Sequence, residues 1–224
     1  MKKNKIFVAC DTTNIKKIKK IITHTKNPKF KIGYKFGLEF LNSKNGRKFV
    51  SKLKNKIIFA DYKLHDIPNT CMSTIKAIKD IKINYLTIHI SSGLEALRAA
   101  KKVSKGIKLV GVSILTSMDD RSVKQIGFNK KVSEIVKDQA KIASKAKLDA
   151  IVCSPLEVQL VKKYFKNEVI TPGIRFNSKL NDQRRALSPR QAFMNGADWL
   201  VIGRPITKGN LKKNIKYLEN HLST

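Results

Sequence analysis

Residues 57–70 read IIFADYKLHDIPNT, an apolar run that passes into alternating charges and then reaches a proline. The apolar residues 57–60 are typical of a short buried strand. Pro68 suits the first turn of a helix, where its missing N–H is not needed. The stretch therefore predicts a strand, a short charged loop and then a helix.

The same alternation continues along the chain. Between the apolar runs, Lys-rich segments such as 15–23, 70–79 and 132–145 carry apolar residues three and four apart, which is the spacing of half-buried helices. Eight strand–helix units imply a parallel sheet closed into a (β/α)8 TIM barrel, with all of residues 1–224 in a single domain. The predicted strands lie at 6–10, 31–35, 57–63, 85–89, 109–114, 150–153, 169–171 and 199–202.

Lysine dominates the charge of the chain, which holds 47 Lys and Arg against 16 Asp and Glu, a formal net charge of +31. Only eight of the basic residues are Arg, and the lysines are spread along the chain. This pattern is typical of exposed helix faces, and it would also steer a small anionic substrate. A basic RNA-binding protein is the alternative, but it needs clustered cations and stacking aromatics, and five Tyr and one Trp offer few of these. We expect no nucleic-acid partner.

The cysteines Cys10, Cys71 and Cys153 are odd in number and share no metal-ligand spacing. We expect them to be reduced thiols in a cytoplasmic protein. The apolar run at 6–10 is too short for a signal peptide, and no stretch approaches the roughly 18–20 apolar residues of a membrane span. The sequence therefore predicts a cytoplasmic location without a membrane partner.

Charged residues gather where the third predicted strand ends. In barrels of this kind the chemistry takes place at the C-terminal ends of the strands. Asp61 and Lys63 are two residues apart, so the strand period points both toward the barrel mouth, with Lys35 on the neighbouring strand. A salt bridge that anchors the loop would explain one such pair. Two ammonium groups with Asp61 and a second carboxylate, Asp66, favour a catalytic site.

This run resembles the signature of the orotidine 5′-phosphate decarboxylase family. The pattern Asp-x-Lys-x-x-Asp-Ile-Pro-Asn-Thr covers residues 61–70, and further motifs extend over almost the whole chain. Their order and their place at predicted strand ends make the combination specific. The further motifs are Asp11, Tyr34-Lys35-Phe36-Gly37, Leu115-Thr116-Ser117-Met118, Thr171-Pro172-Gly173-Ile174-Arg175, Asp182-Gln183-Arg184-Arg185, Gly196-Ala197-Asp198 and Ile202-Gly203-Arg204-Pro205.

The resemblance implies decarboxylation of orotidine 5′-phosphate to UMP and CO2 in de novo pyrimidine biosynthesis, without a cofactor or a metal ion. It assigns Lys63 to stabilise the negative charge at ring carbon six and to protonate that carbon. Lys35 and Asp61 would hold Lys63 in position and keep it charged. The catalytic residues implied are Lys63, Asp61, Asp66 and Lys35.

The resemblance also implies a homodimer in which Asp66, Ile67 and Thr70 complete the site of the partner subunit. The spacing of these residues does not establish this arrangement. As an alternative, Asp66 is a negative charge near a helix N-terminus, which needs no dimer.

Substrate binding is implied for a wider set of strand-end residues. Arg204 would bind the phosphate after the last strand, where such barrels commonly do so, although a plain surface charge is the alternative. Gln183 would close over the substrate from a loop with Arg175 at its base. Asp11 and Lys35 would contact ribose hydroxyls, and Thr116 and Ser117 would contact the pyrimidine edge. The implied set is Asp11, Lys35, Asp61, Ile67, Thr70, Thr116, Ser117, Arg175, Gln183, Gly203 and Arg204.

Two points stay open at this level. His89 fits a barrel-mouth histidine as well as a substrate contact. A sugar-phosphate decarboxylase of the same superfamily has a related acid–Lys–Asp pattern, which it uses to hold Mg²⁺ and to stabilise an enediolate. The run at 67–70 and the Pro-Gly-Ile-Arg motif ending at Arg175 favour the pyrimidine enzyme.

Overall fold

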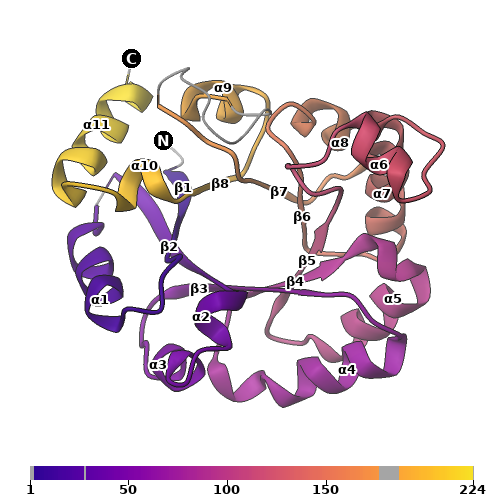
Figure 1. Cartoon of the computed structure of the whole chain (residues 1–224), viewed down its shortest axis with the longest axis horizontal. Coiled ribbons are helices and arrows are strands. Elements are labelled where there is room, and N and C mark those ends of the chain that lie inside the picture. Colours follow the sequence, from indigo (N-terminus) through magenta and orange to yellow (C-terminus); the bar gives the residue numbers. More distant parts are fainter. Residues whose placement is uncertain (1–2, 28, 177–186, 224) are drawn as a thin grey trace.

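The computed structural model describes residues 3–27, 29–176 and 187–223 of the chain. In this part, eight parallel strands close into a barrel in sequence order, and β8 pairs with β1 (Figure 1). The predicted (β/α)8 barrel is thereby confirmed. The strands are β1 (Asn4–Ala9), β2 (Phe30–Gly37), β3 (Ile57–Leu64), β4 (Tyr85–His89), β5 (Lys108–Val112), β6 (Ala150–Val152), β7 (Glu168–Thr171) and β8 (Trp199–Ile202).

Helices surround the barrel as an outer ring (Figure 1). In the described part of the chain, none of them is long and apolar enough to cross a membrane. They are α1 (Ile15–His24), α2 (Leu38–Leu41), α3 (Gly46–Ser51), α4 (Pro68–Ala77), α5 (Gly93–Val103), α6 (Asp120–Gln125), α7 (Val132–Lys145), α8 (Val158–Tyr164), α9 (Pro189–Met194), α10 (Arg204–Thr207) and α11 (Leu211–Ser223), with the 3₁₀ turns η1 (Lys79–Ile81) and η2 (Ile90–Ser92).

The elements predicted from the sequence differ from the structure mainly at their ends. The strands predicted at 85–89 and 199–202 and the helix predicted at 132–145 agree with β4, β8 and α7 at both ends. The helix predicted at 70–79 begins two residues earlier, at Pro68, because this proline occupies the first turn. The strand predicted at 109–114 ends earlier, at Val112.

Aromatic side chains fill the inside of the barrel. The rings of Phe7 and Trp199 stack with their centroids 4.0 Å apart, and Phe59 and Tyr85 contact the Phe7 ring from its sides. Gly33, which faces Phe7 across β1 and β2, leaves room for that ring, because a Cβ there would lie 2.6 Å from Phe7 Cδ1. The inside of the barrel is therefore a packed core, as is usual for this fold.

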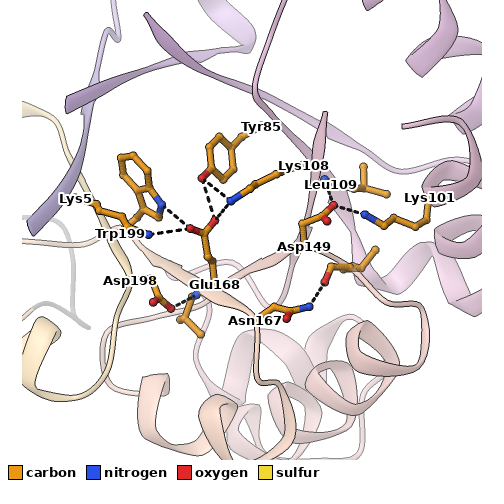
Figure 2. Close-up of polar contacts among 12 residues, drawn as sticks. Lys5, Tyr85, Lys101, Lys108, Leu109, Asp149, Asn167, Glu168, Asp198 and Trp199 are labelled. Atoms are coloured by element: carbon orange, nitrogen blue, oxygen red, sulfur yellow. Dashed lines mark hydrogen bonds and ion pairs between the residues drawn. The ribbon is translucent and has the colours of Figure 1, made fainter. Parts of the chain in front are cut away.

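The N-terminal end of the barrel is closed by polar contacts around Glu168, which the sequence analysis did not predict (Figure 2). Its carboxylate accepts hydrogen bonds from Lys5 at 3.0 Å, Lys108 at 2.8 Å, Tyr85 at 2.9 Å and Trp199 at 3.3 Å. Burial alone would raise the pKa of this carboxyl, but the hydrogen bonds from Lys108, Lys5 and Tyr85 lower it to about 2. Glu168, the first residue of β7, is therefore ionised at neutral pH and is hydrogen-bonded to residues at or near the starts of β1, β4, β5 and β8.

A second polar arrangement recurs at this end of the barrel. The residue directly before each of β4, β6 and β8 accepts the backbone N–H of the second residue of the preceding strand, which fixes the ends of neighbouring strands together. Figure 2 shows two of the three pairs. The pairs are Asn84 with Ile58 at 2.8 Å, Asp149 with Leu109 at 2.8 Å and Asp198 with Val169 at 2.9 Å.

Candidate active site

A cavity of about 290 Å³ opens at the C-terminal ends of the strands, opposite the Glu168 cluster. Its walls are partly apolar, from side chains such as Phe59, Val112, Val152 and Val201. It also brings together eight residues that the sequence predicted for the site. These are Asp11, Lys35, Asp61, Lys63, Thr116, Arg175, Gly203 and Arg204.

The charged layer lies directly above the apolar layer because of the strand period. Phe59 belongs to the core inside the barrel, and Asp61 follows it by two residues on β3. Lys35 follows Gly33 by the same interval on β2. Side chains two residues apart on a strand face the same side, so both charged groups point inward above the packed rings.

Four charged side chains form a continuous array at the floor of the cavity. Lys35 Nζ lies 3.1 Å from Oδ1 of Asp11 and 3.6 Å from Oδ2 of Asp61. Lys63 Nζ lies 2.8 Å from the same Oδ2 of Asp61. The Asp61 side chain is only 13% exposed and that of Lys35 only 14%, whereas Lys63 is 33% exposed. Lys63 is therefore the more accessible of the two cations that flank Asp61.

The charges of this array stabilise one another. Burial alone would raise the pKa of Asp61, but the positive charges of Lys35 and Lys63 hold it below its usual value. Burial alone would lower the pKa of Lys35, but the carboxylates of Asp61 and Asp11 raise it above its usual value. Asp61 is therefore anionic and Lys35 cationic at neutral pH, which keeps a negative charge beside the Lys63 ammonium.

The backbone around Lys63 is irregular, whereas the sequence predicted a regular strand at this position. Strand β3 pairs with β4 at Ala60 and again at Leu64, so residues 61–63 face Thr87 alone. Lys63 has a φ of 49°, in the left-handed region that non-glycine residues rarely adopt. The Lys63 N–H donates to Thr87 Oγ1 at 2.7 Å. Such bulges re-aim side chains and are common next to active sites.

The residues predicted to act in a partner subunit lie outside this cavity. Asp66 is exposed in the loop after β3, and Thr70 is exposed in the first turns of α4. Ile67 is 66% exposed, which is unusual for a large apolar side chain. Asp66 also lies two residues before Pro68, the first residue of α4, where a negative charge favours the helix. The contribution in trans stays a prediction.

Other predicted residues have more varied positions. Ser117 is exposed beside Thr116, and Gln183 lies outside the described residues. Gly203 lies beside the end of β1, since a Cβ there would be in ordinary contact with Ala9 Cβ at 3.5 Å and with Oδ2 of Asp11 at 3.6 Å. Arg204 follows it as the first residue of α10. The end of β8 is thereby adjacent to the charged array.

His89 forms a pair with His65, and their ring centroids lie 5.2 Å apart. Burial first, and then the charges of His65 and Lys63, lower the pKa of His89, so its ring is neutral at pH 7. Among the described residues that line the cavity, His89 does not appear. Of its two interpretations, the position favours a barrel-mouth histidine.

One functional candidate, Thr87, was missed in the sequence. It is fully buried on β4, and its hydroxyl donates to Asp61 Oδ1 at 3.1 Å. A polar residue inside the apolar run 85–88 was the available signal.

As for metals, within residues 3–27, 29–176 and 187–223 no three His, Cys, Asp or Glu side chains are grouped so as to share an ion.

Comparisons with known proteins place this chain in a family. The sequence profile described as "Orotidine 5'-phosphate decarboxylase / HUMPS family" matches residues 4–215. The orotidine 5'-phosphate decarboxylase of Wolbachia pipientis subsp. Culex pipiens is 41% identical over 216 residues, which are 92% of this chain and 93% of the relative. That of Carboxydothermus hydrogenoformans is 38% identical over 96% of this chain and 95% of the relative.

A solved structure agrees with these matches. The crystal structure of orotidine 5'-phosphate decarboxylase from Lactobacillus acidophilus superposes with a TM-score of 0.83 at 28% sequence identity, covering 99% of this chain and all of that one. The similarity therefore extends from the sequence to the complete barrel. This chain belongs to the orotidine 5'-phosphate decarboxylase / HUMPS family.

Proposed function

We propose that this chain is a carboxy-lyase that converts orotidine 5′-phosphate to UMP and CO2 in pyrimidine biosynthesis, with no cofactor. The names of the relatives that align over nearly the whole chain support this reaction. The observation that carries it is the Lys63 ammonium, held by Asp61 beside Lys35 at the floor of a partly apolar cavity. A fixed cation in such a place is what the reaction requires.

The chemistry assigned to Lys63 follows from the charge that the reaction develops. When the bond between ring carbon six and the carboxylate breaks, CO2 leaves and the electron pair stays on carbon six. The nearby ammonium stabilises this negative charge most where water is excluded. Lys63 then gives one proton to carbon six, which completes UMP, and the neutral amine takes up a proton from solvent.

Asp61 and Lys35 act on Lys63 and do not exchange protons with the substrate. The Asp61 carboxylate holds the Lys63 ammonium at 2.8 Å, so that a negative charge lies beside the proton donor. Lys35, which contacts both Asp61 and Asp11, holds that carboxylate in place from the neighbouring strand. Asp66 of the partner subunit is assigned to the same array.

Binding of the substrate is assigned to the rim of the same cavity. Arg204 and Arg175 line it together with Lys63, and a guanidinium is well suited to a phosphate dianion. Asp11 would bind the ribose and Thr116 the pyrimidine edge. Such contacts away from the reacting carbon hold the ring in place and favour closure of the site.

The remaining assignments concern Ser117, Gln183, Gly203 and the subunit partner. Ser117 would contact the pyrimidine edge, Gln183 would close over the substrate, and Gly203 would offer its backbone to the phosphate. Asp66, Ile67 and Thr70 would enter the site of a second copy of the chain. The exposed side chain of Ile67 supports such an interface. We also propose a cytoplasmic location, which is favoured by three cysteines that form no disulfide in the described part of the chain.

The direct test follows the absorbance of orotidine 5′-phosphate after purified protein is added in the presence of EDTA, with UMP identified by chromatography. We expect an absorbance loss that matches UMP formation and does not depend on the chelator. Activity that EDTA removes and Mg²⁺ restores would contradict the metal-independent mechanism assigned to Lys63. No turnover in either condition would overturn the proposed reaction.

A further inference from the structure

Thr87 stands at the one place where the β3–β4 ladder is interrupted. Its side chain is completely buried on β4. It follows Tyr85 of the inner core by two residues, so it faces into the barrel. Across from it, residues 61–63 of β3 make no regular ladder pairs. A buried hydroxyl at such a gap needs hydrogen-bond partners, and those it has belong to the charged array.

The Thr87 hydroxyl connects two parts of the array at once. Its oxygen accepts a hydrogen bond from the backbone N–H of Lys63 at 2.7 Å, and its O–H donates a hydrogen bond to Oδ1 of Asp61 at 3.1 Å. The directions are unambiguous, because an amide N–H only donates and an ionised carboxylate only accepts. The other carboxylate oxygen of Asp61, Oδ2, is thereby left to face the Lys63 ammonium at 2.8 Å.

The backbone of Lys63 needs this support. Its φ of 49° is a left-handed conformation that side chains with a Cβ seldom adopt. Conformations of this kind persist only where the surroundings hold them. In a regular ladder a carbonyl of β4 would accept the N–H, but here the Thr87 side chain takes that role.

We propose that Thr87 is a positioning residue, which fixes the Lys63 ammonium against Asp61 by binding the backbone of one and the carboxylate of the other. Its effect on turnover rests on the proposed function, in which Lys63 is the proton donor. Thr87 is not among the described residues that line the cavity. It therefore acts through the charged array and does not contact the substrate.

Two substitutions separate positioning from simple packing. Thr87→Val keeps the shape of the side chain and removes the hydroxyl, whereas Thr87→Ser keeps the hydroxyl and removes the methyl group. We expect Thr87→Val to lower kcat about 10- to 100-fold with KM within about 3-fold, since a small misplacement of a reacting group is costly. Thr87→Ser should retain kcat within about 3-fold. A packing role would give the opposite order, because the serine leaves the larger void.

Coupling to Lys63 gives a second kinetic criterion. If Thr87 acts through Lys63, Thr87→Val should cause no further loss of kcat in a Lys63→Ala background, because residues that act as a unit are not additive. A full additional 10-fold loss in the double variant would overturn the proposal. Circular dichroism melting of each variant checks the fold, and Thr87→Ala replaces Thr87→Val if the valine variant does not fold.

Crystal structures of the same variants test the geometry without any turnover. In Thr87→Val we expect the distance from Lys63 Nζ to Asp61 Oδ2 to lengthen from 2.8 Å by about 1 Å. In Thr87→Ser it should be unchanged. An unchanged distance in the valine variant would overturn the positioning role, even if the enzyme is active. A lengthened distance in a protein with no turnover would support the positioning role of Thr87. It would count only against the proposed reaction.

Discussion

Lys63 Nζ and Asp61 Oδ2 lie 2.8 Å apart, although the two residues are on the same strand and separated by only one residue. In a regular strand the Cα atoms of such residues stand roughly 6.6 Å apart and their side chains run parallel. The left-handed turn at Lys63 changes the direction of its side chain relative to Asp61. Asp61 Oδ2 also lies 3.6 Å from the Lys35 ammonium, so one buried carboxylate oxygen is shared by two cations.

Replacing Lys63 tests the centre of the proposed mechanism. We expect Lys63→Ala to lower kcat for orotidine 5′-phosphate by at least about 10³-fold, because both the cation and the proton source are lost. UMP binding, measured by calorimetry, should stay within about 10-fold, since the phosphate contacts remain. Lys105→Ala, an exposed lysine at the other end of the barrel, is the matched control and should keep full activity. Near-normal turnover of Lys63→Ala would remove Lys63 from the mechanism.

Replacing Arg204 tests the binding of the phosphate. We expect Arg204→Ala to raise KM about 10- to 100-fold, which corresponds to the loss of a charge-assisted hydrogen bond. The same substitution should have little effect on the slow turnover of orotidine, which lacks the phosphate. An equal loss with both substrates would mean that Arg204 does not bind the phosphate.

Mixing two inactive variants tests the shared site. Chains with Asp66→Asn and chains with Lys63→Ala should each retain only a very small fraction of wild-type activity, because each lacks one of the charged groups assigned to the site. After random subunit exchange about half of the dimers are heterodimers, and in each of these one of the two sites has both native residues. About a quarter of wild-type activity should therefore return. Mass spectrometry under native conditions verifies the exchange. If heterodimers form and no activity returns, Asp66 acts within its own chain.

The Glu168 cluster predicts a pH-dependent stability. The pKa of Glu168 is about 2 in the folded chain against an ordinary value of 4.5, so the charged form stabilises the fold. This contribution is complete above the ordinary pKa and is lost as the pH falls toward the folded value. We expect Glu168→Gln to lower the free energy of unfolding by about 2 kcal/mol near neutral pH. For a chain of this size, that lowers Tm by about 4–8 °C.

The difference in Tm between wild type and Glu168→Gln should therefore shrink as the pH falls from about 4.5 toward about 2, as measured by circular dichroism. Asp138→Asn is the matched control. Asp138 pairs with Lys130 at 2.7 Å on the surface, and exposed pairs contribute little to stability. We expect Tm to change by less than about 1 °C in this variant. A Glu168→Gln effect as small as that of the control would remove the cluster from the account of stability.

The barrel and the location of its site could be predicted from the sequence because both depend on local periods. An alternation of short apolar runs and helical segments is repeated along the chain, and eight such units in this length indicate a closed parallel barrel. Residues at strand ends then gather at one mouth. For that reason Asp11, Lys35, Asp61 and Lys63, which come from three separate strand ends, could be assigned to one cavity before any distance was known.

Contacts between strands were decided only by the tertiary structure. The gap in the β3–β4 ladder, and the choice of Thr87 to fill it, depend on how two strands align across the barrel. The cluster at Glu168 draws on four other residues whose order in the sequence carries no common pattern. A strand period gives the direction of each side chain, but only barrel closure brings side chains from different strands within hydrogen-bond distance. Local sequence therefore determined which residues meet at the mouth, and the closed sheet determined how they hold one another.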